Sequence, residues 1–256
     1  MLHNFHTHTT RCRHAEGTDE AYVRCALEAG LQTLGFSDHT PYPFSGSYYS
    51  TMRMYPHEFA EYVTSVRSLQ QTYAGRLDIP LGVEAEYYPA HFEKLLQLLR
   101  SERIDYMILG QHWIGNEEGC PYNGRPTDSR AHLIQYCDQS IEAMQTGLFT
   151  YFAHPDLLWF TGDPIAYGEH MQRLCEAAKK CDVPLEINLL GLRTQRHYPT
   201  ERFWEIAAKV GNEVILGCDA HAPSQLLDTA AIDTALDMVD RLGLKLLETA
   251  QLRPIK

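Results

Sequence analysis

The sequence contains no run of about 18 apolar residues, the length that a bilayer-spanning helix needs. Its first ten residues, Met1 to Thr10, are polar and include no apolar stretch of the kind found in secretory signals. Hydrophobic residues make up 44% and charged residues 21%, an ordinary globular balance that excludes a small disulfide scaffold. The seven cysteines are odd in number and form no C-x-x-C motif. We therefore interpret the cysteines as reduced, small core residues and expect a cytoplasmic protein with no membrane partner.

Positive charge is also scarce. Lys and Arg total 22 against 33 Asp and Glu, which gives a net charge of −11. A chain this acidic is repelled by phosphate backbones unless it concentrates positive charge locally, and no basic stripe occurs. We therefore expect no nucleic-acid partner. The sequence leaves the oligomeric state open.

What is present is an alternation of short apolar runs with segments of helical periodicity. The expected strands are Leu2–His6, Leu31–Ser37, Ile79–Glu86, Tyr106–Gln111, Phe149–Ala153, Val183–Leu189 and Val214–Cys218. Between them, apolar residues recur at helical spacing, as in Phe92, Leu95, Leu96 and Leu99. Seven βα units predict a parallel α/β sheet in a single domain over residues 1–256, either as an open doubly wound sheet or as a closed barrel.

Histidine is unusually frequent, with 13 among 256 residues, and its placement separates these alternatives. Six of the seven expected strands end in, contain or are followed by a metal-capable side chain. These groups are His6, His8 and His14, then Asp38 and His39, Glu84 and Glu86, His112, His154, and Asp219 with His221. In a barrel the carboxyl ends of the strands converge on one mouth, whereas an open sheet spreads them along a line. We therefore predict a barrel with a metal site at its mouth.

The remaining histidines lie in helix or loop patterns. We interpret His3, His57, His91, His132, His170 and His197 as surface or packing residues, with His197 a secondary candidate for proton transfer. The sixth strand has no His or Asp at its end and is followed by a loop that carries Arg193 and Arg196.

Imidazole and carboxylate ligands without thiolate suit zinc, iron or manganese. The set exceeds what one ion needs and divides among two or three divalent ions with a bridging carboxylate. Clustered ions of this kind activate water and bind the oxygens of an in-line displacement at phosphorus.

The order and spacing of these motifs resemble the PHP family, named for polymerase and histidinol phosphatase. The matching positions are His6-x-His8, His39, Glu84 after Gly-Val, His112, His154 and Asp219-x-His221. The resemblance covers essentially the whole chain and implies a distorted (β/α)7 TIM-like barrel with up to three ions. It assigns His6, His8, Glu84 and Asp219 to one ion, Glu84, His112 and His154 to a second, and His14, His39 and His221 to a third. Glu86 faces the same side as Glu84, so spacing alone does not choose between them.

Within the family the chain is most similar to the stand-alone histidinol-phosphate phosphatases. The similar segments are Asp38-His39-Thr40-Pro41, Arg53-Met54, Ile187-Asn188, Gly191-Leu192-Arg193 and Tyr198-Pro199. This resemblance implies hydrolysis of a small phosphate monoester, L-histidinol phosphate, to L-histidinol and phosphate. A hydroxide bridging the first two ions would be the nucleophile.

Four further residues are candidates for roles in this reaction. Arg193, with Arg53 or Arg196, is expected to bind the phosphate through charge-assisted hydrogen bonds. The candidate catalytic residues are Asp219, Arg193 and His197, the last as an alternative acid for the leaving alkoxide.

Two other functions use the same residues. A PHP-type phosphodiesterase or exonuclease would act on nucleic acid with the same ligands, although no basic stripe or polymerase-type domain accompanies them. A non-catalytic, metal-stabilised binding module is the third, but the full ligand set argues against it.

Overall fold

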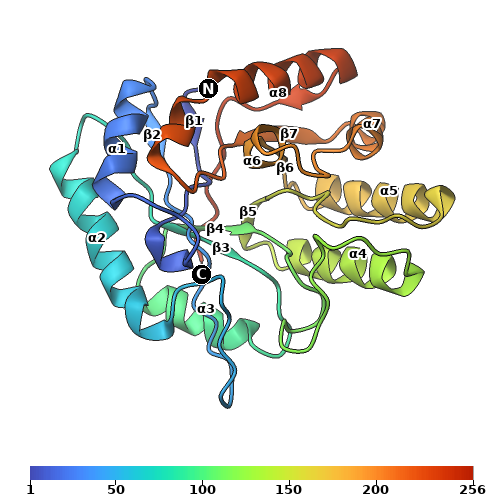
Figure 1. Ribbon diagram of the computed structural model, residues 1–256, viewed down its shortest axis with the longest axis horizontal. Helices are drawn as coiled ribbons and strands as arrows, with labels where there is room; N and C mark the ends of the chain where they lie inside the picture. The colour runs from blue at the N-terminus through green and yellow to red at the C-terminus, as the bar shows by residue number, and fades with distance from the viewer. Residues whose placement is uncertain (256) are drawn as a thin grey trace.

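The computed structural model describes residues 1–255, in which short parallel strands alternate with helices. The strands are β1 (His3–Asn4), β2 (Thr33–Leu34), β3 (Gly82–Ala85), β4 (Tyr106–Leu109), β5 (Phe149–Phe152), β6 (Leu185–Asn188), β7 (Glu213–Gly217) and β8 (Lys245–Leu246). The helices are α1 (Asp19–Glu28), α2 (Phe59–Thr72), α3 (Phe92–Ser101), α4 (Arg130–Gln145), α5 (Pro164–Lys180), α6 (Leu189–Arg193), α7 (Glu201–Val210) and α8 (Thr229–Leu242). Three 3-10 turns, η1 (Thr10–Cys12), η2 (Pro56–Glu58) and η3 (Pro223–Leu227), lie between them. Figure 1 shows the helices arranged around the strands.

The strands form a closed ring. β1 pairs with β2, and β3 to β8 form a parallel sheet in sequence order. Isolated bridges join the two pieces: Phe36 to Leu81 and His39 to Glu84 connect β2 with β3, and Thr7 to Ala220 connects β1 with β7. The open doubly wound sheet is therefore excluded, and the predicted distorted (β/α)7 barrel is confirmed. β8, which the sequence did not predict, is a two-residue strand paired with the start of β7.

Local sequence explains where the helices begin and which face they bury. The Thr18 side chain accepts a hydrogen bond from the Ala21 amide, and Asp19 lies in the first turn of α1, as expected for a helix start. In α3 the residues at helical spacing, Phe92, Leu95, Leu96 and Leu99, are all buried. The helix stripes and outer strand faces form one large apolar core outside the ring.

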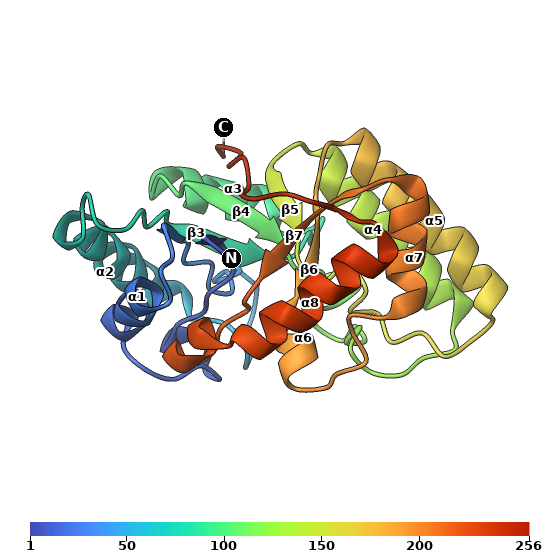
Figure 2. The same cartoon turned by 90° about the horizontal axis from the view of Figure 1, so that it is seen from above.

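The inside of the barrel is divided along its axis. Its amino-terminal end holds a small apolar cluster of Phe5, Tyr106, Ile108, Tyr151, Ala153 and Ile215. Ala250 belongs to the same cluster, and the segment after β8 crosses this end of the barrel (Figure 2). The carboxyl-terminal end is occupied by buried polar side chains. The two ends of the barrel interior therefore have different chemistry, and only one can bind an ion.

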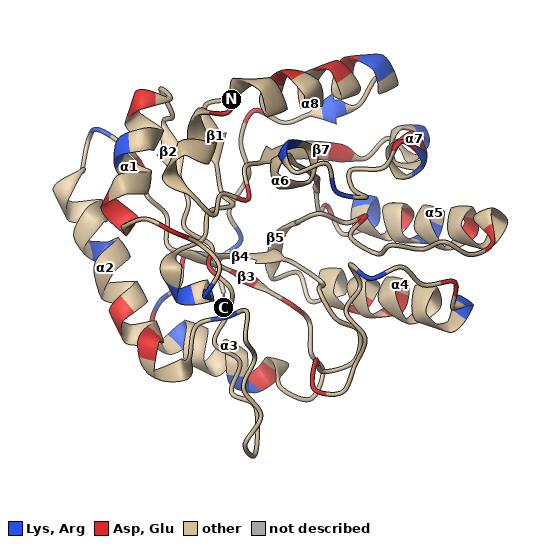
Figure 3. Cartoon of the chain, in the orientation of Figure 1, with Lys and Arg blue, Asp and Glu red and all other residues tan. Residues whose placement is uncertain are grey.

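The surface chemistry matches the composition. In Figure 3 the Lys and Arg residues are dispersed over several helices and loops rather than gathered in one stripe of that view. Of the helices in the described part of the chain, none has both the length and the apolar character that crossing a membrane requires.

Tyr106 holds the amino-terminal end of the barrel together. Its buried hydroxyl lies 2.9 Å from the carbonyl oxygen of Phe5 and 3.1 Å from that of Phe36, so it links β4 to the chain that follows β1 and β2. A Cβ atom at Gly35 or Gly82 would overlap the tyrosine ring or hydroxyl, so glycine is required at both positions.

We expect Tyr106→Phe to lower the free energy of unfolding by about 1–2 kcal/mol, because the substitution removes the donor that bridges two buried carbonyls. Urea denaturation of the metal-loaded protein measures this difference. Tyr49→Phe is the matched control, since Tyr49 is 65% exposed. Equal denaturation midpoints for Tyr106→Phe and the wild type would show that the bridge contributes nothing.

Candidate metal centre

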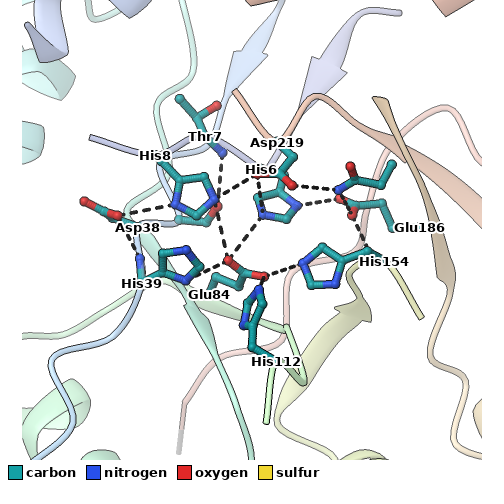
Figure 4. Close-up of polar contacts among 12 residues, drawn as sticks. His6, Thr7, His8, Asp38, His39, Glu84, His112, His154, Glu186 and Asp219 are labelled. Atoms are coloured by element: carbon teal, nitrogen blue, oxygen red, sulfur yellow. Dashed lines mark hydrogen bonds and ion pairs between the residues drawn. The ribbon is translucent and has the colours of Figure 1, made fainter. Parts of the chain in front are cut away.

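The nine predicted ligands meet at the carboxyl end of the barrel. His6 and His8 follow β1, His39 follows β2, Glu84 lies in β3, His112 and His154 follow β4 and β5, and Asp219 and His221 follow β7, while His14 comes from the loop after η1. Figure 4 shows most of these side chains turned toward Glu84. Residues spread from position 6 to position 221 therefore share one small volume, as the barrel predicts.

Two of the ligands have an unusual backbone. His154 (φ 33°) and Asp219 (φ 46°) lie in the left-handed region, which few non-glycine residues adopt. Such strain concentrates at functional sites, where the surrounding structure enforces it. His154 follows β5 and Asp219 follows β7, and both side chains contribute to the cluster.

The geometry of the first set fits a tetrahedral cation. The ring nitrogen Nε2 of His6 lies 3.5 Å from Glu84 Oε2 and 3.5 Å from Asp219 Oδ1. The corresponding distances for His8 Nε2 are 3.5 and 3.1 Å. Ligands about 2.0–2.1 Å from a tetrahedral ion are roughly 3.3–3.4 Å apart, which matches these values.

The same four atoms have no hydrogen-bond partner in the described chain. His6 Nε2, His8 Nε2, Glu84 Oε2 and Asp219 Oδ1 are all buried and unpaired. Buried polar atoms are nearly always satisfied, so four adjacent exceptions indicate a set of cation ligands rather than a packing defect. The residues present therefore fit a metal ion.

The opposite nitrogen of each ring is held by an outer acceptor. His6 Nδ1 donates to Glu186 Oε1 at 2.8 Å, and His112 Nδ1 donates to Glu86 Oε1 at 2.9 Å. His8 Nδ1 lies 3.3 Å from Asp38 Oδ1. With the proton on Nδ1, each Nε2 lone pair faces the cluster, which is the usual arrangement around metal-binding histidines.

Sequence reasoning missed Glu186. It lies in β6, the strand that has no His or Asp at its end. Its second oxygen, Oε2, accepts from the amide of His154 at 3.0 Å and from Asn188 Nδ2 at 3.0 Å. An acidic residue between two apolar ones, Leu185 and Ile187, in a buried strand was the available signal.

Glu84 bridges two parts of the cluster. Its Oε2 faces His6, His8 and His39, whereas its Oε1 faces His154 Nε2 at 2.7 Å and His112 Nε2 at 3.4 Å. A Cβ at Gly110 would overlap this carboxylate, so the glycine leaves space for it. Glu86 lies behind His112 instead, which resolves the choice that spacing left open.

A second cluster adjoins the first. One ring nitrogen from each of His14, His39 and His221 lies within 4.8 Å of the others. The Nδ1 atoms of His14 and His221 lie 2.7 and 3.1 Å from the carbonyl oxygens of Cys12 and Asp219. Burial first, and then the neighbouring His8, lowers the pKa of His14 and His221. The cluster therefore consists of neutral imidazoles, the form that binds metal.

The carboxylates of the cluster are ionised. Burial acts to raise the pKa of Glu84 and Asp219, but the histidines around them hold both pKa values well below the ordinary range. Burial acts to lower the pKa of His6, His8 and His112, but the carboxylates around them raise all three, so a divalent ion would bind there in exchange for protons.

The cluster lies in a cavity of about 990 Å³. Beside the metal ligands, its lining includes Trp113, Tyr122, Arg125, His132, Arg196 and Tyr198. Nη1 of Arg196 donates to the Tyr198 hydroxyl at 2.9 Å. His132 is 7% exposed, in agreement with the packing role expected for it, and it also forms part of the pocket wall.

Arg53 does not bind substrate in this arrangement. Its guanidinium is 3% exposed and forms two hydrogen bonds to Glu86, of 3.0 and 2.9 Å, and a third to Glu117. Two buried carboxylates require a countercharge, and Arg53 supplies it. Because Glu86 also accepts from His112, Arg53 acts behind a candidate metal ligand and does not line the pocket.

The other two candidates also lie outside the pocket lining. Arg193 ends α6, and its Nε donates to Asp228 Oδ2 at 2.8 Å. His197 Nε2 bonds the carbonyl of Leu157 at 2.7 Å, and its ring stacks on Trp159. Arg193 Nη1 is buried with no hydrogen-bond partner in the described chain, but the arginines that line the pocket are Arg125 and Arg196.

We expect Arg53→Met to lower the free energy of unfolding by about 3–5 kcal/mol, because it leaves Glu86 and Glu117 buried without a cation. Urea denaturation measures the change. Arg173→Met is the control: it removes an exposed pair with Asp138 and should cost about 1 kcal/mol or less. If Arg53→Met instead leaves the free energy of unfolding unchanged and raises KM, Arg53 contributes to substrate binding.

The family comparison agrees with this geometry. Residues 4–189 match the family model described as PHP domain. Similar relatives are the "Probable histidinol-phosphatase" of Deinococcus radiodurans, 32% identical over 233 residues that cover 86% of each chain, and that of Schizosaccharomyces pombe, 26% identical over 86% of this chain and 81% of the relative.

The fold also has a solved counterpart. It resembles a histidinol phosphate phosphatase of Lactococcus lactis, solved with zinc, L-histidinol and phosphate, with a TM-score of 0.74 and 20% identity over 100% of this chain and 98% of the other. The resemblance inferred from the motif residues is confirmed by the family model, which matches the greater part of the sequence: this chain belongs to the PHP domain family.

Proposed function

We propose that this chain is a metal-dependent phosphatase that hydrolyses L-histidinol phosphate to L-histidinol and phosphate. The observation that carries the proposal is the set of buried, unpaired ligand atoms around Glu84 at the floor of an open pocket. The substrate is supported by the names of the Deinococcus and Schizosaccharomyces relatives and by the molecules bound in the Lactococcus structure.

The donor set would hold two divalent ions through Glu84 and the residues around it, and His14, His39 and His221 would hold a third. Imidazole nitrogen and carboxylate oxygen without thiolate suit zinc, manganese or iron. Divalent ions in such a site make a nucleophile available at neutral pH and offset charge on the phosphoryl oxygens.

Residues of the chain orient the histidine ligands and bind the phosphate. Glu186, Glu86 and Asp38 hold the Nδ1 atoms of His6, His112 and His8, so Nε2 of each of these rings faces the cluster. Arg196 lines the pocket and is the candidate that can meet two phosphoryl oxygens with parallel hydrogen bonds. The Tyr198 hydroxyl accepts from Arg196, which leaves its own proton free for the substrate.

The metal requirement and the substrate are tested together. We expect gently purified protein to contain about two or three transition-metal ions per chain, and activity to disappear on chelation and return with Mn or Zn. Elemental analysis is paired with a panel of histidinol phosphate, phenyl phosphate, a chromogenic diester and single-stranded DNA. We expect histidinol phosphate to have the highest kcat/KM. Less than about one ion with no gain on adding metal contradicts the proposal, and digestion of DNA assigns the site to a nuclease instead.

The role of Arg196 has its own test. Arg196→Ala should lower kcat/KM for the monoester by about 10²-fold, because it removes a donor to charge that develops in the transition state. Arg193→Ala, which breaks a pair with Asp228 outside the pocket, should change kcat/KM by less than about threefold. Steady-state kinetics of both variants measure these changes. A larger loss of kcat/KM in Arg193→Ala than in Arg196→Ala would make Arg193 the phosphate ligand, as the sequence first suggested.

A further inference from the structure

The loop between β4 and α4 forms a wall of the pocket. It supplies Trp113, Tyr122 and Arg125, and the first turn of α4 adds His132. The backbone N–H of Asn123 donates to the backbone carbonyl of His112 at 2.7 Å, so this wall is attached to the end of β4, where a candidate metal ligand lies.

Hydrogen bonds fix the His132 ring in one tautomer. Asn123 Nδ2 lies 2.8 Å from the carbonyl oxygen of Gln111. A carbonyl only accepts, so the amide nitrogen must face Gln111, and Asn123 Oδ1 faces His132 Nε2 at 2.7 Å. That oxygen also only accepts, so Nε2 carries the proton and Nδ1 of the neutral ring carries a lone pair.

Two features keep the ring neutral. His132 lies in the first turn of α4, where the positive end of the helix dipole disfavours an imidazolium. Burial lowers the pKa of His132 further. Within residues 1–255 no group hydrogen-bonds to Nδ1, and the residue lines the pocket with 7% of its surface exposed, so the acceptor can be reached only by a molecule in the pocket.

The other polar groups of the lining are candidate metal ligands or can donate hydrogen bonds. Glu84 and Asp219 are the carboxylates among the described lining residues, and both belong to the metal ligand set. Arg125 and Arg196 only donate, and the Tyr and Thr hydroxyls both donate and accept. Nδ1 of His132 is thus an atom of the lining that only accepts and is not committed to metal. Trp113 and Tyr122, with ring centroids 5.1 Å apart, add aromatic surface to the same wall.

We propose that His132 determines substrate choice by accepting, through Nδ1, a hydrogen bond from an N–H group on the organic half of the phosphate monoester. The inference rests on the proposed function, since phosphate bound at the ion cluster leaves the organic half to meet the wall. The donor is the ammonium or the imidazole N–H of a substrate such as histidinol phosphate. Asn123 is a positioning residue that sets the tautomer.

The test compares wild type and His132→Phe on four monoesters. L-histidinol phosphate has both donors, L-phenylalaninol phosphate keeps the ammonium, imidazolylpropyl phosphate keeps the imidazole, and phenyl phosphate has neither. We expect His132→Phe to lower kcat/KM for histidinol phosphate by about 10- to 100-fold and to leave phenyl phosphate within about twofold, because a single hydrogen bond to the donor is lost. L-phenylalaninol phosphate and imidazolylpropyl phosphate each have one of the two donors. The one whose kcat/KM falls as much as that of histidinol phosphate identifies the group that donates to His132.

Controls separate recognition from folding. His132→Asn retains an acceptor oxygen near the Nδ1 position and should recover most of the preference. His170→Phe, on α5 and outside the pocket lining, should have no effect on it. Calorimetric titration of L-histidinol into each metal-loaded variant gives a readout independent of turnover, and thermal unfolding checks that each variant is folded.

The outcomes are distinguishable. If the wild type hydrolyses histidinol phosphate and phenyl phosphate with equal kcat/KM, the proposed substrate is wrong. If the wild type prefers histidinol phosphate and folded His132→Phe keeps the whole preference and the affinity for L-histidinol, His132 does not recognise the substrate. If His132→Phe lowers kcat/KM equally for all four monoesters, the inference is also wrong, because the residue then affects catalysis and not the choice between substrates.

Discussion

The buried carboxylate of Glu84 is the constraint around which the carboxyl end of the barrel is built. Five histidine rings, from the chain after β1, β2, β4 and β5, direct a nitrogen at its two oxygens. An anion in this position costs a great deal of solvation free energy unless cationic or hydrogen-bonding groups surround it. The strand ends, the space left by Gly110 and the ring orientations all serve to surround that charge.

The division of the barrel interior follows from the same requirement. At the amino-terminal end, apolar side chains and the Tyr106 hydroxyl pack the centre and join neighbouring strands. At the other end, polar side chains replace apolar packing, so cohesion there depends on the outer carboxylates and their hydrogen bonds to the candidate ligands. Stability and function are thereby assigned to opposite ends of the strands, as is usual for this architecture.

A hydrogen-bond acceptor behind a histidine ring occurs both at the candidate metal centre and at His132. Around the ion cluster, carboxylates and carbonyls accept the Nδ1 proton of a histidine and leave Nε2 as the free ligand. At His132, the Asn123 oxygen faces Nε2 and leaves Nδ1 free. In each case an acceptor behind the ring decides which nitrogen faces the pocket. The partner of a histidine, rather than the histidine alone, therefore determines what the residue can bind.

The sequence by itself determined the alternation of strands and helices, the parallel barrel and the residues that gather at its mouth, because periodicity and the common direction of parallel strands are properties of the backbone. Only the tertiary structure decided that Arg53 neutralises Glu86 and Glu117, that Arg193 pairs with Asp228, that Glu186 supports His6, and that His132 faces the pocket. These partners are up to 180 residues apart. Side-chain charge shows that a partner is needed, but the packing of distant loops decides which partner is within reach.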